Sequence, residues 1–330
     1  METPLETKRP TSPQAEEILG LYFPVLDHGF VSLVDYMGSD EDVERAARVS
    51  YGYGTRRTSE TRGLIRYLRR HRHTTPSEMV ELKFHCAMPI FIARQWVRHR
   101  SASLNEYSGR YSLLPLLFYR PAAEHFQAQS TSNRQGRGAD LRELHPDAIA
   151  RWEGVRRAAA EQYSWLVEHD VARELARIDL PLSTYTQWYW KIDLHNLFHF
   201  LSVRADPHAQ YEIRAYANVI AGMLKRVAPL SFEAWVDYEL CGAHLSRAEL
   251  AALRRLVRVA GGDLETPGAA RLTTKELIDL GLSKREVEEL LAKLASAPPA
   301  DDFDLDLAAA RPAEHFARLM EEAVPRVDRR

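Results

Sequence analysis

The stretch 80–100, VELKFHCAMPIFIARQWVRHR, changes its hydrophobic period at one proline and thereby decides the fold class. In its first half apolar and polar residues alternate, as in a strand with one buried face. Pro89 suits the first position of a helix, and after it the apolar residues Ile90, Ala93 and Val97 recur at helical spacing. A strand that leads directly into a helix predicts a fold built from both kinds of element.

The flanking sequence repeats this mixture. A strand is expected to end at Gly38, in HGFVSLVDYMG, and another in LSTYTQWYW, which is rich in aromatic and β-branched residues. Helices are expected over 39–50, 59–73, 147–168 and 192–204, where apolar residues recur at helical spacing. Asp170 and Asp206 are expected to begin the helices that follow them.

Composition limits the class of protein. The 330 residues are 45% hydrophobic and 27% charged, which is ordinary for a globular protein. A net charge of −2 argues against a general binder of polyanions, and two cysteines cannot build a disulfide framework. Because the sequence shows neither a membrane-length apolar run nor the apolar core of a signal peptide, we expect a cytoplasmic protein with no membrane partner.

The chain is expected to divide into three parts. Residues 1–18 are polar and contain Pro10 and Pro13, which favours a flexible N-terminal tail. Residues 19–241 carry the mixed pattern and are expected to form the main domain. Residues 242–330 are rich in Ala and Leu and predict a helical C-terminal extension of unknown role. Its expected capping boxes are Ser246 with Glu249 and Ser283 with Glu286.

The densest group of polar residues is RHRSASLNEYSGRYS, residues 98–112. Its arginines can bind oxyanions through paired hydrogen bonds, and Gly109 allows close approach of the backbone. No Gly-rich phosphate loop is present, so side chains must bind any phosphate. A salt-bridged surface loop is the plain alternative. Ser108 lacks a G-x-S-x-G context, which favours ligand binding over nucleophilic catalysis.

Two other patterns leave alternatives open. The basic stretch RGLIRYLRRHRHTTPSE can contact nucleic acid or a phosphorylated cofactor, or its arginines can simply solvate a helix. His195 and His199 share a helix face, but without the glutamate of H-E-x-x-H they favour pocket or ordinary hydrogen-bonding histidines, and no metal is expected. The C-terminal TTKELIDLGLSKREVEELL is similar to a helix-turn-helix but is acidic on balance, which disfavours DNA.

RHRSASLNEYS is R-H-R, seven residues and then S, and in this the chain resembles the flavin-dependent thymidylate synthases. The segments HTTPSE, PIFIARQWVRHR, SGRYS, ARIDLPL, LHNLFHFL and RADPHAQYEI follow in the family's order and approximate spacing. The resemblance covers residues 28–240. It implies an α/β (α+β) subunit with a mostly antiparallel twisted sheet packed with long helices, and a homotetramer whose active sites lie between subunits.

The resemblance also implies a methyltransferase that converts dUMP to dTMP. Methylenetetrahydrofolate gives the carbon, FAD carries hydride to the pyrimidine, and NADPH reduces the flavin again. Arg204 is then the catalytic residue, whose guanidinium polarises the uracil ring. His73 lies on the folate side. The implied dUMP contacts are Gln95, Trp96, Val97, Arg98, Glu106, Tyr107, Ser108, Gly109, Arg110, Arg177 and Arg204. The implied FAD contacts are Thr75, Arg98, His99, Arg100, Glu106, Asp193, His195, His199 and His208.

The chain departs from the family pattern at several of these positions. Met79 stands where many members have a histidine, and Ser77 stands in place of an aromatic residue. Asp193, His195 and His199 replace an N-x-R and a later asparagine. A flavoprotein of the same fold that acts on another pyrimidine nucleotide is the alternative within enzymes, and a nucleic-acid-binding protein is the alternative outside them.

Overall fold

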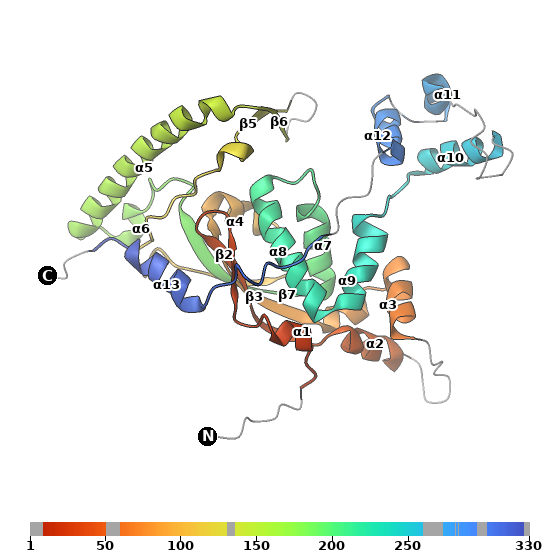
Figure 1. Cartoon of the computed structure of the whole chain (residues 1–330), viewed down its shortest axis with the longest axis horizontal. Coiled ribbons are helices and arrows are strands. Elements are labelled where there is room, and N and C mark those ends of the chain that lie inside the picture. Colours follow the sequence, from red (N-terminus) through yellow and green to blue (C-terminus); the bar gives the residue numbers. More distant parts are fainter. Residues whose placement is uncertain are drawn as a thin grey trace. The chain divides into compact units, whose positions relative to one another are not determined.

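A five-stranded sheet is the centre of the larger of two compact units in the computed structural model (Figure 1). Its strands lie in the order β1-β2-β3-β7-β4, and all neighbouring pairs are antiparallel. The strands are Tyr22–Val25 (β1), Gly29–Met37 (β2), Glu81–Pro89 (β3), Ser103–Glu106 (β4) and Tyr185–Asp193 (β7). The structure describes residues 9–50, 60–130, 136–259, 273–280, 282, 284–295 and 302–326. The predicted mixed fold with a mostly antiparallel sheet is confirmed.

One face of the sheet is buried by helices. The alternation noted in the sequence turns Phe84 of β3 and Trp190 of β7 toward this face, where they are register partners. Helices α4 (Ile90–Trp96), α7 (Leu194–Arg204) and α8 (Tyr211–Val227) pack here, with α7 and α8 side by side (Figure 1). Trp96 stacks with Phe200 of α7 in this core. The strand-to-helix junctions at both Pro89 and Asp193 therefore point α4 and α7 back over the same sheet face.

The remaining elements of this part surround the sheet. The helices are α1 (Pro13–Glu16), α2 (Asp40–Val49), α3 (Thr61–Arg70), α5 (His145–Glu168), α6 (Arg173–Ala176), α9 (Pro229–Trp235) and α13 (Ala313–Glu322). The 3-10 turns are η1 (Thr75–Met79), η2 (Ala123–His125) and η3 (Arg142–Leu144), and a separate hairpin joins β5 (Gln127–Gln129) to β6 (Arg137–Asp140). The strands and helices expected around residues 28–50, 59–73 and 147–204 are confirmed within a few residues.

The opposite sheet face is covered in part by the C-terminal helix α13. Phe316 and Met320 of α13 pack against Phe30 of β2 in a buried cluster. The preceding chain is joined to β1, because Tyr22 and Arg311 exchange two backbone hydrogen bonds of 2.9 and 2.8 Å. Residues 302–326 thus complete the sheet-containing part, although they follow a separate unit in the sequence.

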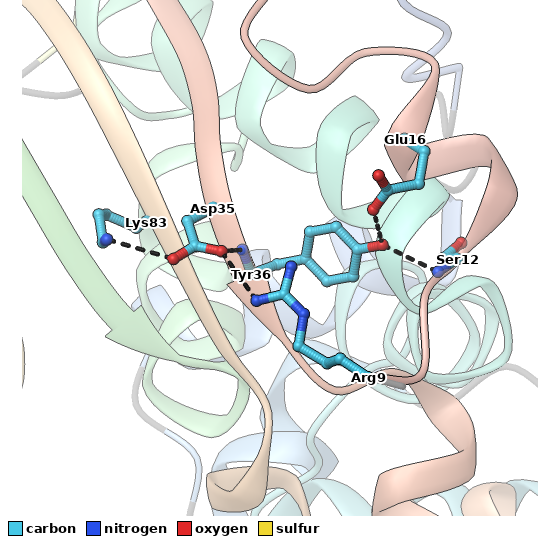
Figure 2. Close-up of polar contacts among 6 residues, drawn as sticks. All are labelled: Arg9, Ser12, Glu16, Asp35, Tyr36 and Lys83. Carbon is cyan, nitrogen blue, oxygen red and sulfur yellow. Dashed lines mark hydrogen bonds and ion pairs between the residues drawn. The ribbon is translucent and has the colours of Figure 1, made fainter. Parts of the chain in front are cut away.

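The N-terminal segment lies against β2 rather than forming a tail from residue 9 onward (Figure 2). Ser12 donates its backbone N–H to the Tyr36 hydroxyl at 2.9 Å, and that hydroxyl donates to Glu16. Arg9 contacts Asp35 at 3.3 Å. Ordered structure had been expected to begin near residue 19, but these contacts begin at residue 9; residues 1–8 lie outside the described part of the chain.

The chain divides into two compact units, Met1–Trp235 with Asp302–Arg330, and Val236–Asp301. The second unit contains the π-helix η4 (Val236–Leu240) and helices α10 (Arg247–Val259), α11 (Thr274–Asp279) and α12 (Lys284–Ala295). Its small core comprises Ala252, Leu277, Leu282, Val287 and Leu290. The capping box of Ser246 and Glu249 is confirmed, while the second expected box depends on residue 283, which lies outside the described residues.

Two expected helix caps are wrong. Asp170 has φ 61° at the turn after α5, and α6 begins only at Arg173, without a side-chain cap. Asp206 accepts the backbone N–H of His208 at 2.7 Å, and α8 begins later at Tyr211. Asp170 takes the left-handed backbone conformation after α5, and the Asp206 side chain closes a turn ahead of α8. No helix within the described residues is both long and apolar enough to cross a membrane.

Candidate active site

Helix α7 positions four of the predicted site residues. Asp193 caps it, because its Oδ1 accepts the backbone N–H of Asn196 at 2.9 Å and its Oδ2 accepts the Asn196 amide at 2.7 Å. The helix then carries His195, His199 and Arg204, while its apolar positions are buried in the core. One capped helix therefore presents these basic side chains at fixed spacing.

Arg204 and His99 lie in contact, as the R-H-R segment turns back from α4 onto α7. Arg204 Nε donates to His99 Nε2 at 3.0 Å, and Arg204 Nη2 donates to the backbone oxygen of Gln95 at 3.2 Å. The His99 ring lies 5.8 Å from that of His199, between ring centres, and 5.0 Å from that of Phe200. The structure therefore brings together residues that are about a hundred positions apart in the sequence.

The protonation of this cluster is set by burial and by positive charge. Burial, together with the charges of Arg204 and His199, lowers the pKa of His99 to about 4, so His99 is neutral at pH 7 and can accept from Arg204. Burial and the charge of Arg98 lower the pKa of Arg204, which still stays protonated. Within the described residues no carboxylate pairs with Arg98, Arg100 or Arg204. Arg98 and Arg100 are exposed and Arg204 is half-buried, and arginines without a counter-charge are suited to an anionic ligand.

The turn 108–112 is tightly packed on a second arginine. Tyr111 and Ser112 donate backbone N–H groups to the Ser108 carbonyl at 3.2 and 3.0 Å. A Cβ atom on Gly109 would lie 3.1 Å from Cδ of Arg177, so glycine permits this approach. Arg110 is paired with Glu174 at 2.8 Å on the surface. The structure therefore places Arg177 beside the turn and directs Arg110 toward α6.

Two neighbouring predicted contacts, Glu106 and Tyr107, have hydrogen-bond partners within the chain. Glu106 ends the edge strand β4 and accepts the Thr186 hydroxyl at 2.8 Å. Tyr107 donates its hydroxyl to the Leu113 carbonyl at 2.7 Å. The Trp96 side chain is fully buried in the aromatic core, which leaves only its backbone for a ligand, whereas Val97 is 40% exposed.

His73 and Thr75 line a cavity of about 860 Å³ between α2, α3 and η1. The His73 ring stacks on Tyr67, with 5.9 Å between centres. Met79 also lines the cavity and is 48% exposed, at the position where many family members have a histidine. The turn η1, which forms one wall of the cavity, also packs against α7 and β7, the elements that carry His195 and Asp193.

The remaining histidines differ in environment. His195 Nδ1 is buried and, among the described residues, has no hydrogen-bond partner. His208 is exposed in the turn before α8, where its Nδ1 lies 2.9 Å from Asp206. The described residues contain no group of three or more His, Cys, Asp or Glu side chains that could hold a metal ion.

Two arginines of the basic stretch around α3 form ion pairs with a glutamate. Arg62 and Arg66 both contact Glu233 of α9, at 2.5 and 2.8 Å. Residues 51–59, which precede α3, lie outside the described part of the chain. The two arginines therefore fasten α3 to α9.

Sequence reasoning missed a polar chain behind α4. Gln95 Nε2 donates to Gln210 Oε1 at 2.5 Å, and Gln210 Nε2 donates to Glu212 Oε2 at 2.8 Å. Arg137 of β6 contacts the same carboxylate at 2.5 Å. Gln210 and Glu212 lie within the segment RADPHAQYEI, which could have marked them as candidate site residues. No sequence motif surrounds Arg137 that could have done the same.

Comparison with known proteins gives one consistent result. Residues 32–230 match the family Thy1, described as "Thymidylate synthase complementing protein". The flavin-dependent thymidylate synthase of Gluconobacter oxydans (strain 621H) is 52% identical over 89% of this chain and 94% of its own. That of Rickettsia bellii (strain RML369-C) is 46% identical over 82% and 97%, respectively. The structure of a UMP/dUMP methylase, PolB from Streptomyces cacaoi bound with 5-Br dUMP, is 33% identical with a TM-score of 0.60, covering 65% of this chain and 97% of that one.

Proposed function

The chain belongs to the family of flavin-dependent thymidylate synthases, and we propose that it catalyses the reductive methylation of dUMP to dTMP. Methylenetetrahydrofolate gives the one-carbon unit and leaves as tetrahydrofolate, and NADPH supplies the hydride that turns this unit into a methyl group. The supporting evidence is the identity of about half of all residues with synthases along most of the chain. The reaction uses soluble nucleotides and cofactors, and the cytoplasm is its proposed location.

One observation carries the proposal at the level of chemistry. Arg98 and Arg204 lie close enough for the charge of one to lower the pKa of the other, and neither is neutralised by a described carboxylate. A guanidinium fixed beside a uracil ring stabilises negative charge on the ring carbonyls, so that electrons can move toward the incoming carbon. The Arg204 guanidinium donates to two acceptors, Nε2 of His99 and the backbone oxygen of Gln95, which hold it in place.

The residues present fit a flavin. His195 Nδ1 is a buried polar atom whose partner is not found among the described residues. We assign the flavin to residues from three regions, and α7 carries the first group. The assigned residues are Asp193, His195 and His199 at α7, Arg98, His99 and Arg100 before β4, and Thr75, Glu106 and His208 elsewhere. When bound, FAD supplies the redox chemistry by passing the hydride of NADPH on to the pyrimidine.

The phosphate of the nucleotide is assigned to the turn 108–112. Ser108 supplies a hydroxyl, Gly109 allows the turn to pack closely on Arg177, and Arg177 supplies a nearby guanidinium. Arg110 can join them by exchanging its exposed Glu174 partner for the ligand, because an exposed ion pair of this kind is worth only about 0.2–1 kcal/mol. His73 in the neighbouring cavity is assigned to the folate side.

We propose a homotetramer with shared active sites. Helix α5 and the segments on either side of it expose large apolar side chains, a pattern found at protein interfaces. They are Leu144, Trp152, Val155, Trp165, Leu175, Ile178 and Leu182. Because the predicted ligand contacts of one chain lie on separate elements, a second subunit would complete the enclosure of the ligands. Light scattering of the purified protein tests the assembly.

UMP is the second candidate substrate, because the related PolB is described as a UMP/dUMP methylase and its structures hold either 5-Br dUMP or 5-Br UMP. The deciding experiment titrates dUMP and UMP into the FAD-loaded protein while the flavin absorption is followed, and then measures release of tritium from the C5-labelled nucleotides with folate and NADPH present. The proposal expects dUMP to change the spectrum and to be methylated. Flavin binding without any response to dUMP would contradict it.

A further inference from the structure

A carboxylate that the proposed reaction does not use lies in the first turn of α8. Glu212 is 2% exposed, and it accepts from Arg137 at 2.5 and 2.6 Å and from the Tyr119 hydroxyl at 3.1 Å. Its other neighbour is the Gln210 amide at 2.8 Å. Burial by itself would raise the pKa of Glu212, but the hydrogen bonds and charge of Arg137 outweigh burial and hold the pKa below its usual value. The group is therefore ionised at neutral pH.

An ionised carboxylate imposes a direction on the amides that touch it. It has lone pairs and no hydrogen, so Gln210 must turn its NH₂ toward Glu212. The Gln210 carbonyl then faces Gln95, which must turn its own NH₂ toward that oxygen, at 2.5 Å. This order follows from the chemistry of the groups and does not depend on how either amide is drawn.

Gln95, the last residue of this hydrogen-bonded series, contacts the proposed catalytic residue Arg204. The backbone oxygen of Gln95 accepts from Arg204 Nη2, and Gln95 is half-buried. Among the described residues no donor is found for Gln95 Oε1. Since its NH₂ is engaged by Gln210, the amide leaves an acceptor for a ligand.

We propose that Glu212 is a positioning residue which, through Gln210, orients the Gln95 amide so that its carbonyl oxygen accepts a hydrogen bond from the bound nucleotide. The inference rests on the proposed function and deepens it. A pyrimidine nucleotide offers two suitable donors, the N3–H of a uracil ring and the 3′-hydroxyl of the sugar. Phosphate oxygens are acceptors and are excluded as partners of this oxygen. Arg204 beside Gln95 favours the ring.

The test measures affinity rather than turnover, using flavin absorption of the FAD-loaded enzyme. Three ligands are compared: dUMP, its 3-methyl derivative, which lacks N3–H, and its 3′-deoxy derivative, which lacks the hydroxyl. In Gln210→Met the Gln95 amide loses its fixed direction, and we expect dUMP to bind about tenfold more weakly, as for one lost hydrogen bond. One of the two analogues lacks the donor that Gln95 contacts, and the ratio of its Kd to that of dUMP should fall by the same factor. The corresponding ratio for the other analogue should stay as in the parent enzyme.

Glu212→Gln should act in the same sense, because an amide can face Gln210 with either end. Tyr119→Phe is the matched control, since it removes a hydrogen bond to Oε1 of the same carboxylate and leaves the Oε2 contact with Gln210; it should keep both preferences. A merely structural role of Glu212 would lower stability in all three variants without changing any preference, and unchanged preferences in folded Gln210→Met would overturn the inference. A parent enzyme that binds flavin but no dUMP would instead overturn the proposed function, and this inference with it.

Discussion

Arg204 donates the hydrogen on Nε to Nε2 of His99 across 3.0 Å, so the proposed catalytic guanidinium is held by a histidine in its neutral form. A protonated His99 has no free lone pair at this atom and would place a second positive charge beside the first. The orientation of Arg204 thus depends on the low pKa of its partner.

Replacement of Arg204 tests its role. Arg204→Ala should lower kcat about a hundredfold or more, because it removes the positive charge that we propose lies beside the uracil ring, while FAD stays bound. Steady-state dTMP formation and the flavin spectrum report the two properties separately. Arg94→Ala, on the exposed side of α4, is the control and should behave as the parent. Arg204→Ala enzyme with near-parental turnover would remove Arg204 from the reaction.

The His99 contact predicts a pH dependence of stability. The pKa of His99 is about 4 in the folded protein and about 6.5 when unfolded, so between these values the unfolded state binds more protons. Stability should therefore fall as the pH is lowered from about 6.5 toward 4. In His99→Gln the fall in Tm over this range should be smaller, whereas the exposed His208→Gln should match the parent. Parallel Tm curves for parent and His99→Gln would contradict the assignment.

Gly109 predicts an effect on nucleotide affinity. In Gly109→Ala the new methyl group would lie 3.0 Å from Leu114 and 3.1 Å from Arg177, so the turn or Arg177 must shift. We expect the KM for dUMP to rise about tenfold, the equivalent of one lost hydrogen bond to the phosphate, with flavin binding retained. Gly63→Ala on α3 meets no atom within 4 Å and should instead stabilise the protein by about 0.5–1 kcal/mol. Equal behaviour of the two variants would argue against a tight phosphate turn.

The cap of α7 predicts a loss of stability. Asp193→Ala leaves the Asn196 N–H without its acceptor and should cost about 1 kcal/mol in the free energy of unfolding, measured with urea. Asp193→Asn keeps an oxygen for that N–H and should cost clearly less. If both variants unfold like the parent, the cap does not hold this end of α7.

The C-terminal helix predicts a still larger effect. Phe316 is 5% exposed against Phe30, and Phe316→Ala should destabilise the protein by about 3–5 kcal/mol. Leu307→Ala, at a residue 45% exposed, should change stability by less than about 0.5 kcal/mol. Removal of everything after Gly242 deletes α13 as well, so the truncated protein should unfold more readily than the full chain in a thermal melt.

Local signals predicted the elements that depend on them. The capping box of Ser39 and Asp42 marks α2, and the aromatic alternation before Asp193 marks β7, because each is fixed by neighbouring residues. Segments fixed by distant partners were missed. The Ser12 hydroxyl donates to the backbone oxygen of Arg226 at 2.6 Å. The edge strand β4 is exposed and is held by its pairing with β7. Neither partner can be read from the segment's own sequence.

The candidate site divides in the same way. The R-H-R motif pointed to Arg98 and His99, but only the fold could place His99 on Arg204, since the two lie on different elements. Likewise the sequence contains Gln210 and Glu212 in a suggestive segment, yet their order toward Gln95 depends on how α8 packs beside α4. The sequence therefore predicted which residue types belong to the site, but it did not predict the directions in which their side chains point.

The return of residues 302–326 to the sheet has a consequence for synthesis on the ribosome. A chain made from its N-terminus exposes Tyr22 and Phe30 first, while the helix that covers them is among the last segments to be translated. The second unit, Val236–Asp301, can assemble its own small core during this interval, whereas the larger unit still lacks the helix that covers one face of its sheet. Its nascent form carries an uncovered aromatic face through most of elongation, which is where chaperone binding or aggregation would begin.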